Sequence, residues 1–513
     1  MTALDTKTSP ERHIGRTGRW ATLGVLVLAV LLVAVDATVL GLATPFISAD
    51  LKPSGNQLLW IGDVYSFVLA GLLVSMGGLG DRIGRKKVLL AGATAFGAAS
   101  VLNAYATSPE MLIAARALLG VAGATLMPST LALIRNIFTD PRERSLAVGV
   151  WASSASAGAA LGPLVGGVLL EHFWWGSVFL INLPVMALLV LVGIRLLPES
   201  RDPSPGPWDL PSVGLSLVGM VGVVYALKEA ASHGWSAQVG AAGLVGVGAL
   251  VWFVRRQRVL AAPLIDVRLF RHRGFSAAVA ADLFGVLGLT GLVFFLSQFL
   301  QLVQGRSPLE AGLAELPATV GAVVTGLLAG AVARRTSVRA VVAGGLASVG
   351  VALALLTGLE RGTGYGLLFT ALLLVGVGAG FAFTTTSDVI VSSVPKEQAG
   401  AASAVAETAY ELGGALGIAV LGSIVTTVYR GFPTPTGTPA EAAEAAHGSI
   451  GGAVGAAEQL GGERGTALLT AAQDAFAAGL RGTAAVGATI LLATAVAVWF
   501  LLKGQRTDGE PAR

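Results

Sequence analysis

Residues Gly77–Lys87 read GGLGDRIGRKK and form a hydrophilic turn between two long apolar segments. The turn combines one acid with four bases: Asp81, Arg82, Arg85, Lys86 and Lys87. Two glycines, Gly77 and Gly84, permit a close approach or an unusual backbone conformation. Lysines and arginines concentrated in a short loop mark the cytoplasmic side of a membrane. The turn therefore predicts the orientation of every other segment.

The composition indicates a polytopic helical membrane protein. Of the 513 residues, 54% are hydrophobic and 12% are charged, whereas a soluble protein carries about 25% charged residues. Apolar runs of about 20 residues, long enough to cross a bilayer as helices, recur along the chain. We attribute the net charge of +4 to membrane topology and expect no nucleic-acid partner. The absence of cysteine excludes disulfides and cysteine metal sites.

Fourteen membrane spans are expected, so both termini lie on one side. The expected spans are 20–46, 58–80, 88–107, 110–132, 145–170, 174–197, 212–231, 238–254, 274–302, 309–332, 338–357, 364–391, 399–428 and 479–502. When the Gly77–Lys87 turn is placed inside, the inner segments hold 26 lysines and arginines and the outer segments hold seven. This asymmetry predicts two cytoplasmic termini. The polar N-terminus up to Arg19 resembles a retained tail more than a cleaved signal.

An internal repeat predicts how the spans are grouped. GGLGDRIGRKKVLLAG at the second span resembles GLLAGAVARRTSVRAVVAGG at the tenth. Glycine pairs four residues apart also recur, at Gly158 and Gly162 in the fifth span and at Gly413 and Gly417 in the thirteenth. Both matches lie eight spans apart. The simplest scheme is two six-helix bundles separated by a two-helix insert.

The expected organisation follows from this scheme. Its parts are a cytoplasmic tail (1–19), an N-terminal six-helix bundle (20–197), a two-helix insert with linkers (198–273), a C-terminal six-helix bundle (274–502) and a second cytoplasmic tail (503–513). The last bundle includes an extracellular loop, 429–478, that is rich in Ala and Gly and mildly acidic. The sequence leaves open whether this loop folds into a hairpin or stays mobile.

Several motifs resemble those of the major facilitator superfamily. Residues 77–86 match the turn between its second and third helices, and residues 158–167 resemble a fifth-helix motif of its antiporters. Residues 35–39, followed by Pro45, and residues 60–65 look like motifs of its fourteen-helix drug:proton antiporter branch, which includes multidrug exporters of the QacA and LfrA type. The resemblance covers all fourteen spans. It implies an all-α major facilitator fold and a protein that is no enzyme.

The resemblance also implies a function. It points to a proton-coupled antiporter that exports lipophilic, mostly cationic drugs, dyes and biocides across the bacterial plasma membrane by alternating access. The implied partners are small-molecule substrates, protons and the lipid bilayer, and the implied state is a monomer. A narrow exporter of a self-made antibiotic would share every motif, so this alternative stays open. The fifth-span motif argues against a proton-coupled nutrient symporter, and the short polar tails argue against a membrane sensor.

The Gly77–Lys87 turn is expected to act as a gate. In the packing of the family, Asp81 would face the start of the thirteenth span, near Gln398–Ala401. A carboxylate at a helix N-terminus is favoured by about 0.3–1 kcal/mol, and Asp81 could also pair with Arg82 or Arg85. The expected gate residues are Gly77, Asp81, Arg82, Gly84 and Arg85. The alternative is that the loop is basic only because it lies on the cytoplasmic side of the membrane. Such a loop would need neither Asp81 nor the glycines.

The fifth span carries small residues on one face. Glycines four residues apart allow helices to approach closely, and a proline adds a kink. In the family's antiporters this motif seals the two halves against leak. The resemblance transfers that role to Gly158, Gly162, Pro163, Gly166 and Gly167. Ordinary packing of small residues is the alternative.

Ionisable residues inside the spans are costly in a bilayer and are therefore functional candidates. Asp36 lies 16 residues into the first span, roughly 24 Å at 1.5 Å per residue. Arg116 lies at a similar depth in the fourth span. We expect the two side chains to approach each other and to take part in proton coupling, since the family assigns proton transfer to the matching arginine. A structural ion pair is the alternative.

Two glutamates of the thirteenth span form the second candidate. Glu407 and Glu411 lie one helical turn apart and share a face. Because neighbouring carboxylates resist double ionisation, one of them could release a proton when a cationic drug arrives. Tyr410 would offer an aromatic face to that cation. The alternative is that one of the two glutamates is only a residue of the helix start and has no role in transport.

These arguments give two sets of expected site residues. The proton-coupling set is Asp36, Arg116, Glu407 and Glu411. The substrate-binding set is Asp36, Asp63, Tyr65, Asp282, Glu407, Tyr410 and Glu411. No cofactor or metal is expected, because the chain lacks a GxxxxGK[ST] phosphate-binding loop and an HExxH zinc pattern. An ion gradient is then the expected energy source.

Overall fold

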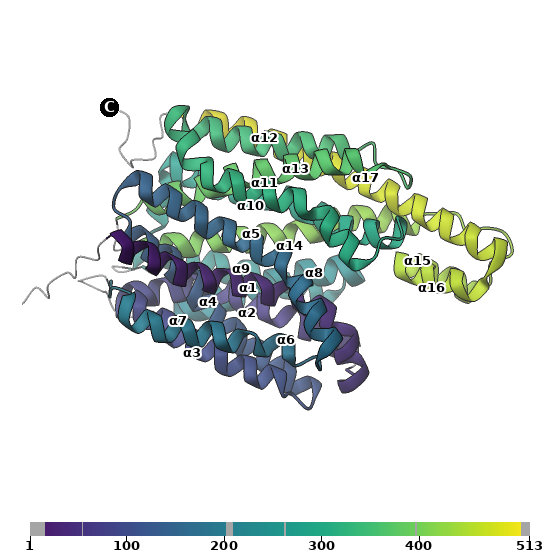
Figure 1. Cartoon of the computed structure of the whole chain (residues 1–513), viewed down its shortest axis with the longest axis horizontal. Coiled ribbons are helices and arrows are strands. Elements are labelled where there is room, and N and C mark those ends of the chain that lie inside the picture. Colours follow the sequence, from purple (N-terminus) through teal and green to yellow (C-terminus); the bar gives the residue numbers. More distant parts are fainter. Residues whose placement is uncertain (1–15, 54, 202–208, 261–262, 396–397, 504–513) are drawn as a thin grey trace, which may run out of the picture.

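The computed structural model describes residues 16–53, 55–201, 209–260, 263–395 and 398–503. Within these ranges all regular structure is helical, and the long helices run side by side along the molecule (Figure 1). The all-α fold class is confirmed. The expected tail residues 1–15 and 504–513, and residues 202–208 of the insert's linker, lie outside the described ranges.

The helices have the following bounds in chain order. They are α1 (Arg16–Leu51), α2 (Gly55–Ile83), α3 (Arg85–Ala104), α4 (Pro109–Ile137), α5 (Pro141–His172), α6 (Ser177–Leu180), α7 (Asn182–Leu196), α8 (Leu210–His233), α9 (Ala237–Val259), α10 (Arg273–Gln298), α11 (Pro308–Arg335), α12 (Val338–Leu356), α13 (Tyr365–Ser392), α14 (Ala399–Arg430), α15 (Ala440–Gly448), α16 (Ile450–Leu460) and α17 (Gly462–Leu501). A 3₁₀ turn (Val267–Arg271) precedes α10, and a π-helical turn (Phe299–Val303) extends it.

The described chain contains 13 segments that are long and apolar enough to cross a membrane. They coincide with 13 of the expected spans, one of which consists of α6 and α7 together. The remaining expected span is α5, a 32-residue helix in the same bundle. The start of α1 and the end of α17 lie at the same end of the molecule (Figure 1), as an even number of spans requires. The chain is therefore a multi-pass membrane protein.

The helices pack in two groups. Helices α1 to α5 and α7 contact one another and enclose one apolar core, and helices α10 to α14 and α17 enclose another. The groups meet where α2 and α4 contact α14 and where α5 contacts α11 and α13. Helix α8 lies against both α2 and α14, and α9 packs on α8. We call the two groups the N-terminal bundle and the C-terminal bundle.

The repeated glycines occupy equivalent places in the two bundles. Gly158 of α5 packs against the Leu31 carbonyl of α1, and Gly413 of α14 packs against the Leu283 carbonyl of α10. At both positions a Cβ would overlap with the neighbouring backbone. The repeat seen in the sequence is thus matched by repeated packing between helices.

The last helix differs from the predicted span, 479–502. Helix α17 begins at Gly462 and has 40 residues, so it is about 60 Å long at 1.5 Å per residue. This is about twice the thickness of a bilayer's hydrocarbon core. The first half of α17 is polar enough to be excluded from a span, yet its alanines and the acid Glu463 in its first turn favour a helix.

The loop 429–478 is therefore largely helical. Helices α15 and α16 form a hairpin beside the projecting half of α17, at the end of the molecule away from the chain termini (Figure 1). The hairpin is tied to α14 by a hydrogen bond of 2.7 Å that Tyr429 Oη donates to the Ala446 carbonyl. The sequence left open whether this loop folds into a hairpin or stays mobile, and the structure shows a hairpin.

Candidate functional site

Asp81 joins α2 to the start of α14. Its Oδ1 accepts a hydrogen bond from the backbone N–H of Gly400 at 3.1 Å, and its Oδ2 accepts one from Ala401 at 3.0 Å. Arg85 donates to the same carboxylate, with Nη2 at 2.6 Å and Nε at 2.8 Å. Asp81 thus faces the helix N-terminus that the sequence predicted, and one of the two expected arginines pairs with it. We call the end of the molecule that carries this turn the inner end.

Two glycines make this contact possible. A Cβ at Gly77 would lie 2.5 Å from the carbonyl oxygen of Gly400, so any larger residue would separate α2 from α14. Gly84 has φ +118°, a conformation that glycine adopts without strain. This turn places Arg85 so that its Nη1 also donates to Ser200 Oγ at 2.8 Å. The turn is therefore built for contact between the bundles and not for charge alone.

A second ion pair joins the bundles at the inner end. Arg144 Nε of α5 donates to Asp388 Oδ1 of α13 at 3.0 Å, and Ser145 Oγ donates to Asp388 Oδ2 at 3.2 Å. Arg144 and Asp388 are both buried, with 4% and 2% of their surface exposed. The sequence did not single out Arg144, because an arginine at the inner end of a span is expected from topology. Together with Asp81, this pair closes the inner end in the present conformation.

Asp36 and Arg116 lie together inside the N-terminal bundle, as predicted. Arg116 Nη1 is 3.4 Å from Asp36 Oδ2, and both residues are almost fully buried. Asn182 Nδ2 of α7 donates to Asp36 Oδ1 at 2.9 Å and to Ser100 Oγ of α3 at 3.0 Å. Arg116 Nε donates to the Ile61 carbonyl of α2 at 3.2 Å. The ion pair is therefore held by hydrogen bonds to α7 and α2, and Asn182 also links it to α3.

Tyr65 lies next to this ion pair. Its ring centroid is 5.0 Å from Arg116 Cζ, a cation–π contact. The residue is 4% exposed, and its Oη has no hydrogen-bond partner in the described structure. Tyr65 also interacts electrostatically with Glu411 of the C-terminal bundle. The side chain is covered in this conformation, and its predicted role in substrate binding stays a prediction.

The C-terminal bundle brings together the other expected site residues. Glu407 and Glu411 of α14 are half-buried, and Glu407 interacts electrostatically with Glu411 and with Asp282 of α10. Asp282 is 4% exposed and is hydrogen-bonded to Thr386 Oγ1 of α13. Tyr410 is 49% exposed. Asp282 of α10 therefore forms one polar cluster with three residues of α14 that lie far from it in the sequence.

The glycines of α5 do not face the other bundle in this conformation. Gly158 and Gly162 both pack against α1, within the N-terminal bundle. The part of α5 that meets the C-terminal bundle lies earlier, where Gly149 packs against Gly326 of α11. The expectation that this glycine face seals the two halves stays a prediction. The glycines hold α5 against α1, which helps to set where the earlier part of α5 meets α11.

The side chains of Asp63 and Pro163, two expected site residues, lie outside the described part of the structure. Trp60, one turn before Asp63 on α2, stacks on Tyr225 of α8 with ring centroids 6.2 Å apart. The outer end of α2 is therefore in contact with the two-helix insert.

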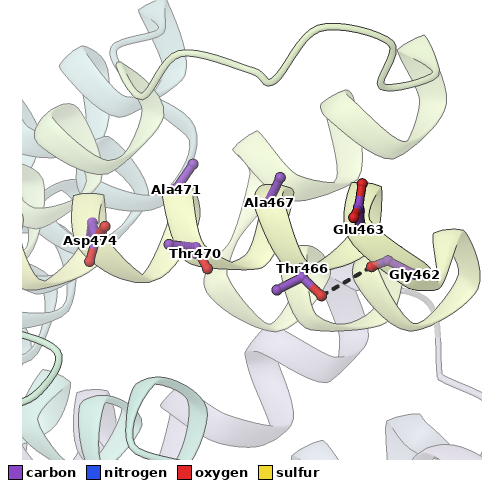
Figure 2. Close-up of a pocket in the computed structure, with 7 residues that line it drawn as sticks. All are labelled: Gly462, Glu463, Thr466, Ala467, Thr470, Ala471 and Asp474. Atoms are coloured by element: carbon purple, nitrogen blue, oxygen red, sulfur yellow. Dashed lines mark hydrogen bonds between the residues drawn. The ribbon is translucent and has the colours of Figure 1, made fainter.

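A pocket of about 910 Å³ lies away from these residues, along the projecting half of α17. One helix face lines it: Gly462, Glu463, Thr466, Ala467, Thr470, Ala471 and Asp474 (Figure 2). None of the expected site residues contributes to this pocket. This outer surface is therefore separate from the two buried polar clusters.

Comparison with known proteins identifies the family. Residues 26–418 match the family model described as Major Facilitator Superfamily. The chain belongs to this superfamily. It is 47% identical over 483 residues to the multidrug efflux pump LfrA of Mycolicibacterium smegmatis, and the match covers 94% of this chain and 96% of LfrA. It is 38% identical over 492 residues to the methyl viologen resistance protein SmvA of Salmonella typhimurium, which covers 95% of this chain and 99% of SmvA.

A solved structure shows the same fold. The human organic anion transporter MFSD10 superposes with a TM-score of 0.57 at 17% sequence identity, over 92% of this chain and 99% of that chain. At this identity the match concerns the fold alone. The resemblance to the major facilitator superfamily and the fold that it implied are confirmed.

Sequence reasoning missed the residues that hold the charged groups in place. Asn182 interrupts an apolar run just before Pro184, and Thr384, Thr385 and Thr386 interrupt another just before Asp388. A fully buried asparagine or threonine needs a hydrogen-bond partner. Such interruptions were the available signal, although they do not reveal which carboxylate each residue meets.

Proposed function

We propose that this protein exports lipophilic, mostly cationic drugs, dyes and biocides across a bacterial plasma membrane in exchange for protons. The observation that carries this proposal is the 47% identity with the multidrug efflux pump LfrA over 94% of the chain. The match with SmvA, a methyl viologen resistance protein, supports organic cations as substrates. The two buried carboxyl clusters give the exchange a physical basis.

The carboxyl groups support proton coupling. In the simplest scheme, a drug cation and a proton compete for Glu407 and Glu411, because a bound cation favours the ionised carboxylates. Asp36 and Arg116 form the corresponding site in the N-terminal bundle. Protonation from the outer side would then displace the drug. One charge that crosses a membrane potential of 100 mV gains about 2.3 kcal/mol, so more than one proton per drug would also draw on the potential.

The contacts at the inner end support alternating access. Asp81 with Arg85 and α14, and Arg144 with Asp388, join the bundles at that end. An inward-facing state requires both contacts to break and their charged groups to be hydrated. We therefore assign a gating role to Asp81, Arg85 and the glycines Gly77 and Gly84, and we add Arg144 and Asp388 to this gate.

Orientation and assembly complete the proposal. The 26 lysines and arginines on the inner segments, against seven outside, support an orientation with both termini in the cytoplasm. Helix α17 and the α15–α16 hairpin then project from the outer face. We propose that the protein works as a monomer, since each bundle has its own core and the two bundles meet within one chain.

The test is ethidium efflux from bacterial cells that express the full chain, with and without a proton uncoupler. Energised cells should accumulate less ethidium than cells without the protein, and the uncoupler should abolish the difference. Glu411→Gln should behave like the empty control, whereas Glu441→Gln, on the exposed α15, should transport normally. Efflux that survives the uncoupler would contradict proton coupling. Transport of one antibiotic without any dye would favour the narrow exporter.

A further inference from the structure

We propose that Asp282 carries the coupled proton in the C-terminal bundle, with the Thr386 hydroxyl as its partner, and that Glu407 and Glu411 hold the cationic substrate. The inference rests on the proposed function, because it concerns how drug export is coupled to protons. It assigns to different residues two tasks that direct competition would give to the same glutamates.

Asp282 is enclosed between α10 and α13. It is 4% exposed, and Thr386 Oγ1 is its hydrogen-bond partner. No lysine or arginine in the described ranges forms an ion pair with it. Since an isolated buried charge is costly, this environment favours the neutral carboxyl group as long as no cation is nearby. Asp36 differs, because Arg116 compensates its charge.

The Thr386 hydroxyl can serve both protonation states of Asp282. Its Oγ1 lies 3.1 Å from the carbonyl oxygens of Ala382 and Phe383, in addition to its contact with Asp282. A hydroxyl has one proton to donate and can also accept. When Asp282 is ionised, Thr386 donates to the carboxylate. When Asp282 is protonated, its O–H donates to Thr386, which donates in turn to a carbonyl of its own helix.

The charged groups that face Asp282 come from α14. Glu407 interacts electrostatically with Asp282 and Glu411, and Tyr410 interacts with all three. Asp388 lies further along α13 and is paired with α5. In the described parts of α12, α17 and the short helical turns that pack against α10, no charged group interacts with Asp282. A cation bound at the glutamates is therefore the change to which Asp282 would respond.

Accessibility separates the carboxyl groups into two kinds. Asp282 is enclosed, whereas Glu407 and Glu411 are half-buried beside the half-exposed Tyr410. The Tyr410 ring meets Phe383 edge-on, with centroids 6.1 Å apart. A planar organic cation can stack against such rings and pair with the glutamates. A proton can reach Asp282, but a drug-sized cation cannot contact it without movement of α10 or α13.

The coupling that follows is electrostatic. A drug cation at Glu407 and Glu411 stabilises the carboxylate form of Asp282, so the O–H bond of Asp282 breaks and its proton leaves as hydronium. Thr386 then turns its proton from a carbonyl to the new carboxylate. On the outer side, a proton from water binds Asp282, Thr386 turns back, and the loss of the negative charge weakens the site for the drug. No redox partner is needed.

The test uses the full chain in lipid nanodiscs and ethidium as the probe. Ethidium affinity is measured from mildly acidic to mildly alkaline pH, and proton release on binding is measured with a pH indicator. Asp282→Asn is neutral at every pH, like the protonated acid, so it should bind ethidium at all pH values about as weakly as the unmodified chain does at acidic pH, and it should lose the proton release. Glu411→Gln should bind ethidium at least about tenfold more weakly.

The Thr386 variants test the partner hydroxyl and serve if Asp282→Asn does not fold. Thr386→Val removes the hydrogen-bond donor that stabilises the Asp282 carboxylate. Half-maximal proton release should therefore shift to a higher pH, at which the proton concentration is about tenfold lower. Thr386→Ser should restore the unmodified behaviour. An unchanged midpoint in Thr386→Val would overturn the inference, and so would proton release from Asp282→Asn.

Transport separates this inference from the proposed function. In proteoliposomes, Asp282→Asn should fail to drive ethidium with a pH gradient but should still exchange ethidium for ethidium, since exchange needs no net proton movement. If Asp282→Asn responds to the pH gradient like the unmodified chain, the inference fails while the proposed function stands. If the unmodified chain does not respond either, the proposed function fails.

Discussion

In the N-terminal bundle the buried carboxylate of Asp36 has an arginine partner, whereas in the C-terminal bundle the buried Asp282 has a threonine hydroxyl. The two environments favour different states, because an adjacent guanidinium stabilises a carboxylate and a hydroxyl can accept a proton from a neutral acid. The charge of Asp36 is therefore compensated by Arg116, whereas Asp282 has no cationic partner in the described ranges and is suited to gain and lose a proton.

The helix packing of the two bundles shows no such difference. Gly158 meets the backbone of α1 as Gly413 meets the backbone of α10. The repeat thus preserves the helix contacts while the polar side chains inside each bundle have diverged. The lesson is that internal symmetry predicts the scaffold of this protein and does not predict which half carries the mobile proton.

The largest expected effect comes from removal of the arginine in the N-terminal bundle. Arg116→Ala leaves Asp36 charged, buried and uncompensated, which should destabilise the protein by about 3–5 kcal/mol and abolish efflux. Thermal unfolding in detergent and ethidium efflux would measure both effects. The double variant Arg116→Ala with Asp36→Asn should regain much of the stability but not the efflux. If Arg116→Ala were as stable as the unmodified chain, Arg116 would not compensate the charge of Asp36, and the contrast between Asp36 and Asp282 would fail.

The next effect concerns the ion pair between the bundles. Asp388→Asn leaves Arg144 without its carboxylate, so the inner end should open more often and efflux should fall by about tenfold, equivalent to about 1.4 kcal/mol. Because the chain has no cysteine, single cysteines near the inner end can report opening through their reactivity. The exchange of charges, Arg144→Asp with Asp388→Arg, should restore closure. No change in reactivity on Asp388→Asn would argue for a purely structural pair.

An effect of similar size is expected from a steric change at the turn between α2 and α3. Gly77→Ala adds a methyl group against the Gly400 carbonyl, and overpacking of this kind costs about 1–3 kcal/mol. Efflux should fall through a weaker inner contact, which the same cysteine-reactivity assay measures. Gly344→Ala on α12 is the matched control, because a Cβ there meets nothing within 4 Å. A loss of efflux in the control variant, with normal efflux in Gly77→Ala, would contradict the role of Gly77 in the contact between the bundles.

The smallest effect provides an example of a purely structural ion pair. Asp209, at the start of α8, accepts hydrogen bonds of 2.8 Å from both Nε and Nη2 of Arg256. Hydrogen bonds from Arg256 hold the pKa of the Asp209 carboxyl below its usual range, and the Ser212 hydroxyl adds to this. The pair therefore stabilises the protein above the pKa of an unfolded aspartate, and the stabilisation is lost as the pH falls through the lower folded value.

Asp209→Asn should thus cost about 1 kcal/mol or less of stability at neutral pH, with a difference that disappears in acid. Its ethidium efflux should equal that of the unmodified chain, unlike that of Asp36→Asn. Thermal unfolding as a function of pH and the efflux assay would check these outcomes. A large loss of efflux in Asp209→Asn would mean that the two-helix insert takes part in the transport cycle.

Much of the architecture was predictable because hydrophobic length and lysine and arginine content are strong local signals. The spans and their number followed from such signals, and the contact of Asp81 with the start of α14 was implied by the resemblance to the family. The approach of Asp36 to Arg116 was also predictable, since a buried charge requires a partner at similar depth.

Other features depend on contacts that no local signal encodes. The extension of α17 back to Gly462 was missed because its first half is too polar for a span, although a polar sequence can still be helical outside a membrane. The pairing of Asp282 with Thr386 depends on the rotation of α10 and α13 about their own axes. The spacing of the α5 glycines likewise defined a shared face but did not reveal that its neighbour is α1.

The unbroken length of α17 has a mechanical consequence. Its membrane half packs with α10 and α12 in the C-terminal bundle, and its other half extends beyond the bilayer beside the hairpin. A rigid helix of this kind acts as a lever arm, so a small tilt of the C-terminal bundle becomes a larger sideways displacement at the outer tip. The position of the hairpin thus reports the orientation of the bundle, and a pair of fluorescent labels on the hairpin and the N-terminal bundle would follow each transport cycle from outside the membrane.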